Sequence, residues 1–370
     1  MKKFCLIYST APHYRKAIFR AIDNEYDCDW YFGKTKSDIK EMDLSILKHY
    51  SYYKCYGNPS KWYWKSVLIN LFKKKYNAYF MLIESRALSD YIFIGLKVLF
   101  FPRKKIYVWT HGWYGKESRL EAKMKLWQLR HVDGIFVYGN YARQLLINKS
   151  IPANKLFVIH NSLHYDQQKA LRERISSTSI YVDHFGNNNH VIIFIGRLTK
   201  VKQLDMLVNT IAILRARGEQ YNLVFVGDGV EREKLKTQVR NLKLQTQVWF
   251  YGACYDEKIN AELIYNADLC VAPGNVGLTA MHAMVFGCPV ITHNCFKWQM
   301  PEFEAIRQGE TGDFFEYKSE QSLMDTISKW FKTKADKREI VRKACYNEID
   351  TRWNPYFQIK VIKQNIIIPE

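Results

Sequence analysis

Several features common in other protein classes are missing from this chain. Its eight cysteines are scattered and form no C-x-x-C pair, which argues against a disulfide framework and favours a reducing compartment. The longest apolar run, residues 91–101, contains Lys97 and is far shorter than the roughly 20 residues that span a bilayer. The apolar run after the opening M-K-K is too short for a secretion signal. We therefore expect a cytoplasmic protein that is soluble or peripheral at the inner face of the plasma membrane.

Sequence motifs of several enzyme classes are absent as well. There is no Walker phosphate loop and no G-x-S-x-G nucleophile turn. The D-x-D spacing of metal-dependent sugar transferases occurs at residues 27–29, but it precedes its predicted strand and so points away from the strand ends where ligands bind. His160 and His164 stand four apart without further ligand residues nearby. We expect neither a metal ion nor a cofactor.

Positive charge is the most unusual feature of the composition. The chain has 55 lysines and arginines against 36 aspartates and glutamates, a net charge of +19. Such a surplus attracts the phosphates of nucleotides, nucleic acids or anionic lipids. In residues 61–75 lysines interleave with aromatic and aliphatic residues, which is typical of a segment on an anionic membrane, although a partly buried helix with a basic solvated face fits equally well. Binding of nucleic acid is disfavoured because no RNA-binding motif is present.

Apolar strand-like runs alternate with helical patterns, which predicts parallel α/β layers. The expected strands of the first half are residues 4–8, 30–32, 78–83, 106–109, 134–137 and 156–159. The expected strands of the second half are residues 191–195, 223–226, 248–251, 269–272 and 289–292. Between the two series, residues 164–189 are polar and irregular, which suggests a linker. A length of 370 residues, 48% of them hydrophobic, is enough for two such units.

The predicted fold class is therefore α/β, with two Rossmann-like domains whose parallel sheets face each other across a cleft. The first domain is expected at residues 1–165, with a C-terminal helix in 352–370 that packs back on it, and the second at 166–351. Ligands of such sheets bind beyond the carboxyl ends of the strands, so the loops directly after strands are the ones to search.

Two loops of the second half carry glycines and charged residues directly after a strand. Gly196 ends one strand and is followed by Arg197 and Lys202, which can converge on an anion as a planar fork and a point charge. The sequence G-D-G at 227–229 follows another strand. Because Arg232 stands where a dinucleotide fingerprint has its third glycine, a tight turn is the simpler interpretation.

A third loop of the second half leads from a strand into a short helix rich in alanine and methionine. The helix begins at Gly277 or Leu278, and its free N–H groups form an anion site to which Thr279 adds a hydroxyl. His282 is the titratable group on this helix, and it is interpreted either as a core histidine or as a contact to a ribose or sugar. Gly287 ends the helix before the next buried strand.

Two loops of the first half also follow strands and face the predicted cleft. They supply the candidate contacts to an acceptor, namely His13, Tyr14, Arg15, Gly112 and Trp113. His111 begins the second of these loops and can orient or deprotonate an acceptor hydroxyl. The rings of Trp113 and Tyr114 suit the face of a sugar. The alternative is a loop histidine without a catalytic role.

Taken together, these loops make the second half resemble the donor-binding domain of the GT4 family of retaining glycosyltransferases, which have the GT-B fold. Residues 196–202 match that family's G-R-x-x-x-x-K phosphate clamp in residue types and spacing. Residues 226–232 resemble its V-G-D-G-x-E-R turn, and residues 250–252 its F-x-G turn beside the base. Residues 282–291 resemble its E-A-M-A-x-G-x-P-V-I segment, except at the glutamate. The likeness is specific between residues 191 and 315 and looser elsewhere.

The likeness departs at the family's pair of glutamates eight positions apart, because the corresponding residues here are Gly274 and His282. The resemblance implies that the first glutamate contacts the donor sugar and the second the ribose, so sugar recognition is altered and Asn275 or His282 is the expected substitute. The phosphates of the donor are assigned by the resemblance to Arg197, Lys202, Gly277, Leu278 and Thr279. The nucleoside and sugar contacts are assigned to Tyr251, Gly252, Asn275 and His282.

The resemblance implies metal-independent transfer of a sugar, with retention, from a UDP- or GDP-linked donor to a glycan or lipid-linked saccharide in surface polysaccharide biosynthesis. The expected catalytic residues are His111, Arg197 and Lys202, the two cations stabilising the leaving diphosphate. A catalytically silent GT-B scaffold or regulatory subunit that binds nucleotide weakly is the main alternative. A GT-B epimerase of UDP-sugars is disfavoured, because it would need carboxylates where Gly274 and His282 stand.

Overall fold

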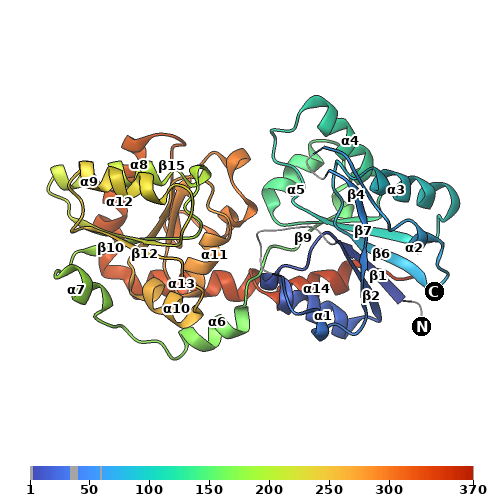
Figure 1. The fold of residues 1–370 in the computed structure, drawn as a ribbon, viewed down its shortest axis with the longest axis horizontal. Helices are drawn as coiled ribbons and strands as arrows, with labels where there is room; N and C mark the ends of the chain where they lie inside the picture. The colour runs from blue at the N-terminus through green and yellow to red at the C-terminus, as the bar shows by residue number, and fades with distance from the viewer. Residues whose placement is uncertain (1–2, 34–40, 59–60, 370) are drawn as a thin grey trace. The chain divides into compact units, whose positions relative to one another are not determined.

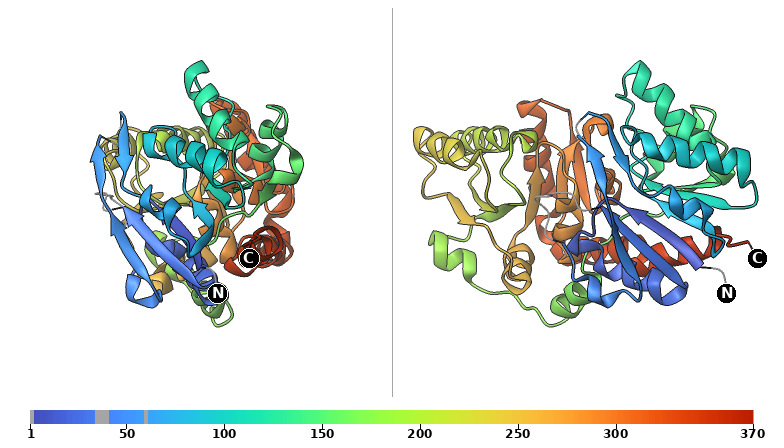
Figure 2. Two further views of the ribbon diagram at one scale, coloured as in Figure 1. Left: turned by 90° about the vertical axis from the view of Figure 1, so that its right-hand side faces the viewer. Right: turned by 45° about the vertical axis from the view of Figure 1, so that its right-hand side comes forward.

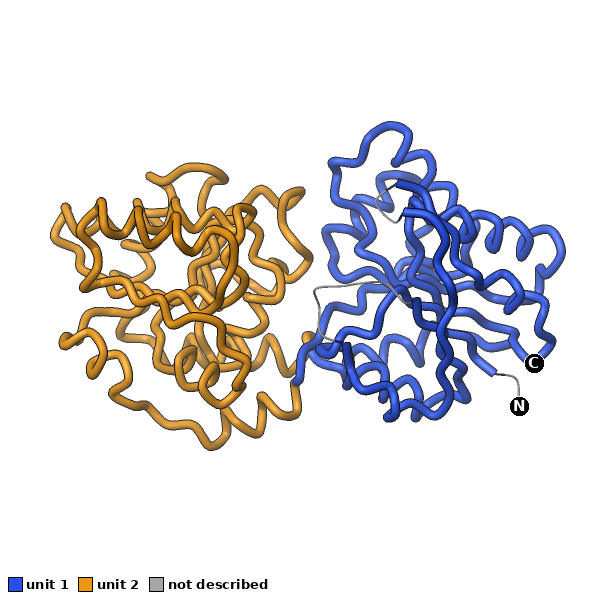
Figure 3. Tube along the Cα trace, viewed as in Figure 1, with its two compact units in different colours: residues 1–164, 354–370 blue, residues 165–353 orange. Residues whose placement is uncertain are grey.

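The structure is a computed structural model that describes residues 3–33, 41–58 and 61–369. It divides the chain into two compact units, residues 1–164 with 354–370 and residues 165–353 (Figure 3). Each unit is built around one large parallel sheet, which confirms the predicted α/β class with two parallel-sheet domains. In the described part of the chain, no helix is both long and apolar enough to cross a membrane.

The first unit contains a seven-stranded parallel sheet in the order β3-β2-β1-β6-β7-β8-β9 (Figure 1). Its strands are β1 (Lys3–Tyr8), β2 (Cys28–Gly33), β3 (Tyr50–Tyr53), β6 (Tyr76–Met81), β7 (Lys105–Thr110), β8 (Gly134–Val137) and β9 (Leu156–Val158). A short antiparallel hairpin is separate from this sheet and consists of β4 (Cys55–Gly57) and β5 (Tyr63–Lys65). The strand order changes direction between β1 and β6, so the loops after these strands flank the point where such sheets bind ligands.

Alternating side chains of the first sheet make two apolar layers, one on each face. Phe4, Leu6 and Tyr8 of β1 belong to one layer, and Cys5 and Ile7 belong to the other. The helices of this unit are α1 (Lys16–Glu25), α2 (Ile69–Phe72), α3 (Leu88–Phe100), α4 (Arg119–Arg130), α5 (Asn140–Ile147) and α14 (Pro355–Asn365). Helix α14 contacts α1, so the end of the chain completes the first unit (Figure 2).

The second unit contains a six-stranded parallel sheet in the order β12-β11-β10-β13-β14-β15. Its strands are β10 (His190–Ile195), β11 (Tyr221–Val226), β12 (Val248–Gly252), β13 (Leu269–Ala272), β14 (Val290–His293) and β15 (Gly312–Phe315). Its helices are α6 (Tyr165–Arg172), α7 (Ile180–Phe185), α8 (Leu204–Ala216), α9 (Arg232–Asn241), α10 (Glu257–Asn266), α11 (Leu278–Val285), α12 (Glu320–Lys334) and α13 (Arg338–Arg352). Figure 1 shows α8, α9 and α12 on one side of the sheet and α10 and α13 on the other. The strand order changes direction between β10 and β13.

The interpretation of residues 164–189 as an irregular linker is wrong, because α6 and α7 form there. Their polar side chains are held by partners in the same unit. Tyr165 Oη donates to Asp350 Oδ1 at 2.9 Å, and Tyr181 Oη donates to the carbonyl oxygen of Leu263 at 2.6 Å. Such helices are hard to predict from the sequence. They are held to the unit by hydrogen bonds to distant residues and lack the broad apolar stripe that marks most helices.

The interpretation of residues 61–75 as one helix with a basic solvated face is wrong as well. The segment forms strand β5, a turn and the four-residue helix α2. The side chain of Lys65 is fully buried and pairs with Asp90 at 2.9 Å and with Glu84 at 3.1 Å. At least one of the lysines in this segment therefore forms ion pairs inside the first unit and is not available to a membrane.

Candidate functional site

The loops after β10 and β13 flank the switch point of the second sheet, and hydrogen bonds tie them together. The Nζ of Lys202 donates to the carbonyl oxygen of Asn275 at 2.6 Å and lies 3.3 Å from its Oδ1. The amide of Gly274 donates to the carbonyl oxygen of Lys202 at 2.9 Å. Thr279 Oγ1 donates to the carbonyl oxygen of Ile195 at 2.8 Å. The structure thus brings the loop with Arg197 and Lys202 to the start of α11.

Glycine is required where these loops meet. A Cβ atom on Gly274 would lie 2.0 Å from the carbonyl oxygen of Val201. Gly227 has φ +146°, and a Cβ atom there would lie 1.9 Å from the carbonyl oxygen of Gly196. Backbone therefore packs directly on backbone along this edge of the sheet. Because position 274 has no room for a side chain, the glutamate that the family resemblance leads one to expect does not fit there without movement of the loop.

The N-terminus of α11 faces this junction without a capping side chain. Its N-cap residue, Gly277, has φ +54° and makes no side-chain cap. The first amides of a helix have no partner within the helix, and they carry the positive end of its dipole. Leu278 is half-buried and Thr279 is buried. This start of a helix can therefore hold an anion with backbone N–H groups.

The ammonium group of Lys202 contacts the two residues just before this helix start, Asn275 and Val276. Burial lowers its pKa to about 8, while the carboxylate of Glu302 opposes the shift and Arg197 adds to it. Glu302 is itself buried in a turn that packs on α11. Arg197 is exposed at the surface of the same loop. An anion bound here would meet one desolvated ammonium and one solvated guanidinium.

His282 lies half-buried on α11, with its Nε2 3.1 Å from Glu257 Oε1. Gln168 donates to the same carboxylate oxygen at 2.6 Å. Burial by itself would raise the pKa of Glu257, but the hydrogen bond and the charge of His282 hold that pKa below its usual range. The structure therefore presents a histidine–carboxylate pair where the resemblance leads one to expect a lone glutamate.

Tyr251 and Gly252 end strand β12 beside the same edge of the sheet. Gly252 accepts a hydrogen bond of 2.7 Å from the amide of Gly227, which links the loops after β11 and β12. The half-buried ring of Tyr251 packs against Trp249, with 5.2 Å between the ring centroids. These residues are therefore held in place by the glycine-rich edge that also carries Lys202.

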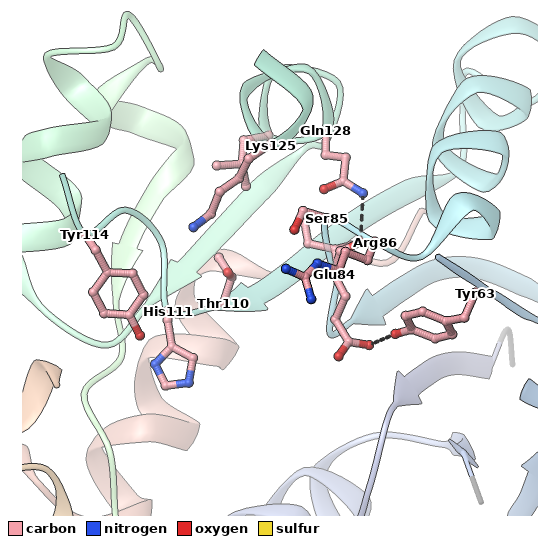
Figure 4. Close-up of a pocket in the computed structure, with 11 residues that line it drawn as sticks. Tyr63, Glu84, Ser85, Arg86, Thr110, His111, Tyr114, Lys125 and Gln128 are labelled. Atoms are coloured by element: carbon pink, nitrogen blue, oxygen red, sulfur yellow. Dashed lines mark hydrogen bonds between the residues drawn. The ribbon is translucent and has the colours of Figure 1, made fainter. Parts of the chain in front are cut away.

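A cavity of about 300 Å³ opens at the corresponding edge of the first sheet (Figure 4). It lies beside the loops that follow β6 and β7, and both α4 and β5 contribute to it. Its lining residues are Tyr63, Ile83, Glu84, Ser85, Arg86, Thr110, His111, Tyr114, Lys125, Gln128 and Leu129. The pocket belongs entirely to the first unit.

Glu84 is the acidic group of this pocket, and hydrogen bonds from two neighbouring hydroxyl groups hold its carboxylate in place. Its Oε2 accepts a hydrogen bond from Ser9 Oγ at 2.7 Å and another from Tyr63 Oη. Burial by itself would raise the pKa of Glu84, but the Lys65 ammonium and the hydrogen bonds from Tyr63 and Ser9 together hold that pKa below its usual range, so the carboxylate is ionised at neutral pH. Asp90 neutralises the other side of Lys65. The carboxylate can accept hydrogen bonds from sugar hydroxyls.

Arg86 and Lys125 supply the cations of the pocket, and Figure 4 shows both head groups directed into it. Burial lowers the pKa of Lys125, and the carboxylate of Glu117, 3.4 Å away, partly opposes that shift. Glu117 also accepts hydrogen bonds from the backbone amides of Tyr114 and Gly115, at 2.9 Å and 3.0 Å. The loop after β7 is therefore held in shape by a carboxylate that also steadies Lys125.

His111 begins the loop after β7 and lines the same pocket. Burial, with smaller contributions from Arg15 and Lys125, lowers its pKa to about 4, so the imidazole is neutral at physiological pH. Its Nδ1 has no hydrogen-bond partner within the described residues. The ring lies 4.8 Å from that of Tyr138, whose hydroxyl accepts a hydrogen bond from Arg15. A neutral imidazole with an available nitrogen can orient a hydroxyl group.

The remaining candidates of the first unit divide between the core and the pocket edge. Trp113 is only 4% exposed and packs in the core, so the expectation that its ring offers a face to a sugar is wrong. Tyr114 lines the pocket instead. Gly112 is buried with φ +73° and allows the chain to turn sharply between His111 and Trp113. His13 and Tyr14 are half-buried beside the loop after β1 and do not line the pocket.

Most of the side chains that build the pocket were not predicted from the sequence. Glu84 and Arg86 could have been found, because they directly follow the strand predicted at 78–83. Tyr63 and Lys125 carry no such signal, since one comes from a hairpin and the other from the middle of α4. Glu257 was missed for the same reason, because its role depends on a contact with His282. Among the described residues, no group of three or more His, Cys, Asp or Glu side chains is arranged to hold a metal ion.

Comparison with known proteins gives a sequence match in the second unit. Residues 182–348 match the sequence model of the family Glycosyl transferases group 1. The chain is 26% identical over 273 residues to an "Uncharacterized 41.2 kDa protein in cps region" of Klebsiella pneumoniae, covering 70% of this chain and 65% of that protein. It is 29% identical over 109 residues to an "Uncharacterized glycosyltransferase" of Haemophilus influenzae, covering 29% of this chain and 30% of that protein. The chain thus aligns with less than two thirds of the length of each relative.

Solved structures are similar over nearly the whole chain. HepE of Anabaena in complex with UDP has a TM-score of 0.73 at 15% identity, with 98% of this chain and 99% of that chain covered. The apo form of the lipopolysaccharide outer core galactosyltransferase WaaB has a TM-score of 0.72 at 15% identity, with 98% and 100% covered. The chain therefore has the GT-B fold, and its sequence likeness to group 1 glycosyltransferases lies in the second unit.

Proposed function

We propose that this protein is a glycosyltransferase that moves a sugar, with retention and without a metal ion, from a nucleotide-diphosphate donor to a saccharide or lipid-linked saccharide. The observation that carries the proposal is the junction in the second unit. There, Lys202 bonds the loop that leads into α11, and the N-terminus of α11 has no side-chain cap. A helix start, a buried ammonium and a nearby guanidinium form a site suited to a diphosphate.

Arg197, Lys202 and the first amides of α11 are the groups that would stabilise the leaving diphosphate. Breakage of the bond between sugar and phosphate leaves negative charge on the phosphate oxygens. Donors fixed in advance around that charge lower the barrier, because they need no reorganisation during the reaction. The likeness to a solved protein in complex with UDP supports UDP as the nucleotide to test first, with GDP second.

The pocket of the first unit is the proposed site for the acceptor. It offers the carboxylate of Glu84 and the cations of Arg86 and Lys125 to hydroxyl and anionic groups of a saccharide. His111, neutral at physiological pH, would hold the acceptor hydroxyl or a sugar hydroxyl by a hydrogen bond. Its role in this proposal is orientation, since an imidazole with a pKa of about 4 is a weak base.

The altered glutamate positions define the sugar side of the donor site. Position 274 has no room for a side chain, so Asn275 is the proposed contact to the donor sugar. At position 282 the pair of His282 and Glu257 would accept a hydrogen bond from the ribose, with the carboxylate supplied from α10. This arrangement favours an active transferase over a silent GT-B scaffold, because a carboxylate stands beside the altered position.

We place the activity in the biosynthesis of a surface polysaccharide, on the cytoplasmic side and peripheral to the inner face of the plasma membrane. The relative from a Klebsiella cps region supports this setting. The net charge of +19 supports an association with anionic lipid.

A thermal-shift panel of UDP, GDP and their sugars tests the proposed function. A ligand that binds only the folded protein stabilises it, by about 2.7 kcal/mol at 100 times its Kd. We expect one nucleotide diphosphate to raise the Tm of wild type and to lose most of that effect in Lys202→Ala. Donor consumption with release of the nucleotide, measured on the same samples, separates an enzyme from a scaffold. Absence of any shift across the panel would refute the donor site.

A further inference from the structure

An unusual set of apolar side chains is exposed on the outside of the first unit. The inner side of α3 buries Phe93 and Ile94 against the sheet. Its outer side exposes Leu88, Ile92 and Leu99, spaced so that they share one stripe of the helix. Leu99 is 74% exposed, and the next residue, Phe100, is 67% exposed. Single exposed apolar residues are ordinary, whereas contiguous ones indicate an interaction site.

Helix α2 extends this stripe, because the end of α3 is fixed to it. The Nζ of Lys104 donates to the carbonyl oxygens of Leu71 at 2.7 Å and Lys73 at 3.0 Å. The rings of Phe72 and Phe101 meet edge to face, with 5.4 Å between centroids. Figure 1 shows the two helices next to each other. The apolar surface, as we define it, consists of Ile69, Phe72, Leu88, Ile92, Val98, Leu99 and Phe100.

Positive charge flanks the apolar surface, and the one acidic residue of α2 and α3, Asp90, is fully buried and paired with Lys65. Residues 44–83 and residues 91–116 contain no aspartate or glutamate. Lys74 and Arg103 are exposed, two residues after Phe72 and three after Phe100. By contrast, Lys97 is neutralised inside the unit by Asp133, at 2.7 Å. The exposed cations therefore stand at the rim of the surface and not beneath it.

We propose that the apolar surface of α2 and α3 inserts into the headgroup region of a bilayer that contains anionic lipid, with Lys74 and Arg103 contacting the lipid phosphates. This inference rests on the peripheral membrane association proposed above, and it identifies the surface of the protein that would contact the membrane. An exposed apolar face with a cationic rim is the pattern of proteins that lie on anionic membranes. A second copy of the chain fits less well, because a two-fold interface would bring the same cations against each other.

Flotation with vesicles tests the surface directly, and it needs neither donor nor acceptor. Wild type is expected to float with vesicles of phosphatidylcholine and phosphatidylglycerol and to stay behind with phosphatidylcholine alone. Leu99→Glu with Phe100→Glu should lower the partition coefficient at least ~10-fold, since two apolar side chains leave the lipid. The matched control carries Val230→Glu with Ile340→Glu, which are 85% and 69% exposed in the second unit, and should bind like wild type.

A second pair of changes tests the cationic rim. Lys74→Glu with Arg103→Glu should weaken binding on the order of 10-fold or more at low salt, because each cation near an anionic surface contributes about a factor of five. A measurement on unaltered protein completes the design: hydrogen exchange at the backbone of residues 95–104 should slow when phosphatidylglycerol vesicles are added. Unchanged exchange there, with binding intact, would overturn the assignment.

The outcomes separate this inference from the proposals on which it rests. Failure of wild type to bind either vesicle overturns both the surface and the peripheral association. Binding that the Leu99 and Phe100 changes leave intact overturns the surface alone. A wild-type dimer that these changes dissociate overturns it in favour of a second copy. Transfer to a water-soluble acceptor is measured separately, so loss of membrane binding with retained transfer leaves the proposed function in place.

Discussion

The two units differ in how they build the edge of the sheet where ligands are expected. In the second unit, the edge is formed mainly by backbone atoms. The loops pack on one another at Gly227 and Gly274, and the first amides of α11 are available to a ligand. In the first unit, side chains form the site, because Glu84 and Arg86 of the loop after β6 and Lys125 of α4 line one pocket. The sequence match to a family covers residues 182–348 and therefore falls in the second unit.

This difference offers a reason why the match to a family model lies in the second unit. A site made of backbone amides requires glycine at particular positions, since any Cβ atom there would collide with a neighbouring carbonyl group. A pocket made of side chains can be built from many combinations of residues and can suit a different acceptor in each relative. We therefore propose that the donor site in the second unit is similar among relatives, whereas the acceptor pocket in the first unit differs among them.

The largest expected effect tests the backbone-built site through its cation. Lys202→Ala should lower the transfer rate about 10²- to 10³-fold, because it removes a donor aimed at the leaving diphosphate. Lys200→Ala is the matched control: Lys200 lies in the same turn but is exposed, so its loss should change the rate less than about twofold. Steady-state kinetics with the donor found by thermal shift would measure both. Equal rates for the two variants would contradict the assignment.

The next effect concerns the glycines that the second unit requires. Gly274→Ala should destabilise the protein by about 3 kcal/mol, since its Cβ would lie 2.0 Å from the carbonyl oxygen of Val201. Gly95→Ala in α3 is the control in the first unit, because its Cβ would make an ordinary contact of 3.9 Å with Trp127. There, alanine should be neutral or stabilising. Chemical unfolding would measure the free energy of unfolding of both variants. Equal values would contradict the claim that the second unit requires glycine where the first does not.

The side-chain pocket gives a smaller effect of a different kind. Lys125→Met should raise the KM for the acceptor about 10- to 100-fold, because a charged hydrogen bond to the bound saccharide is lost. Donor binding should stay within a factor of about two, since the proposed donor site is built from the other unit. Lys123→Met is the control, at an exposed position of the same helix. A change in donor affinity without a change in the KM for the acceptor would reverse the proposed roles of the units.

The smallest effect is the pH dependence of donor binding. Burial holds the pKa of Lys202 at about 8, below its usual range, so the ammonium is charged at neutral pH and loses its proton as the pH rises through that value. Binding of a diphosphate requires the charged form. The Kd of UDP should therefore rise about 10-fold between about pH 7 and about pH 9. Isothermal titration would measure this rise, and Lys202→Ala should lack it. A flat profile for wild type would mean that Lys202 does not contact the ligand.

The fold could be predicted from the sequence wherever strands are buried on both faces. The runs at 134–137 and 269–272 are apolar throughout, and they form β8 and β13 with the predicted limits. Strand β3, with the sequence Y-S-Y-Y, was not predicted because it is an edge strand that exposes three of its four residues. Strand β15 was missed as well, because Gly312 and Asp313 interrupt its apolar pattern.

The candidate site was predictable only in part, for a physical reason. Arg197, Lys202 and Leu278 follow strands that meet at one edge, so parallel topology alone brings them together. The pair of His282 and Glu257 depends on the packing of α10 against its neighbours, which no spacing in the sequence records. The burial of Trp113 could not be predicted from the sequence either, because a tryptophan beside a glycine turn can pack in a core or against the face of a sugar equally well.

A crystal structure of the protein with UDP tests the central claim most directly. The account predicts the diphosphate at the start of α11, with its oxygens within hydrogen-bond distance of the amides of Leu278 and Thr279 and within reach of Arg197 and Lys202. A diphosphate bound elsewhere, or a helix start covered by side chains of the protein while UDP is bound, would contradict it.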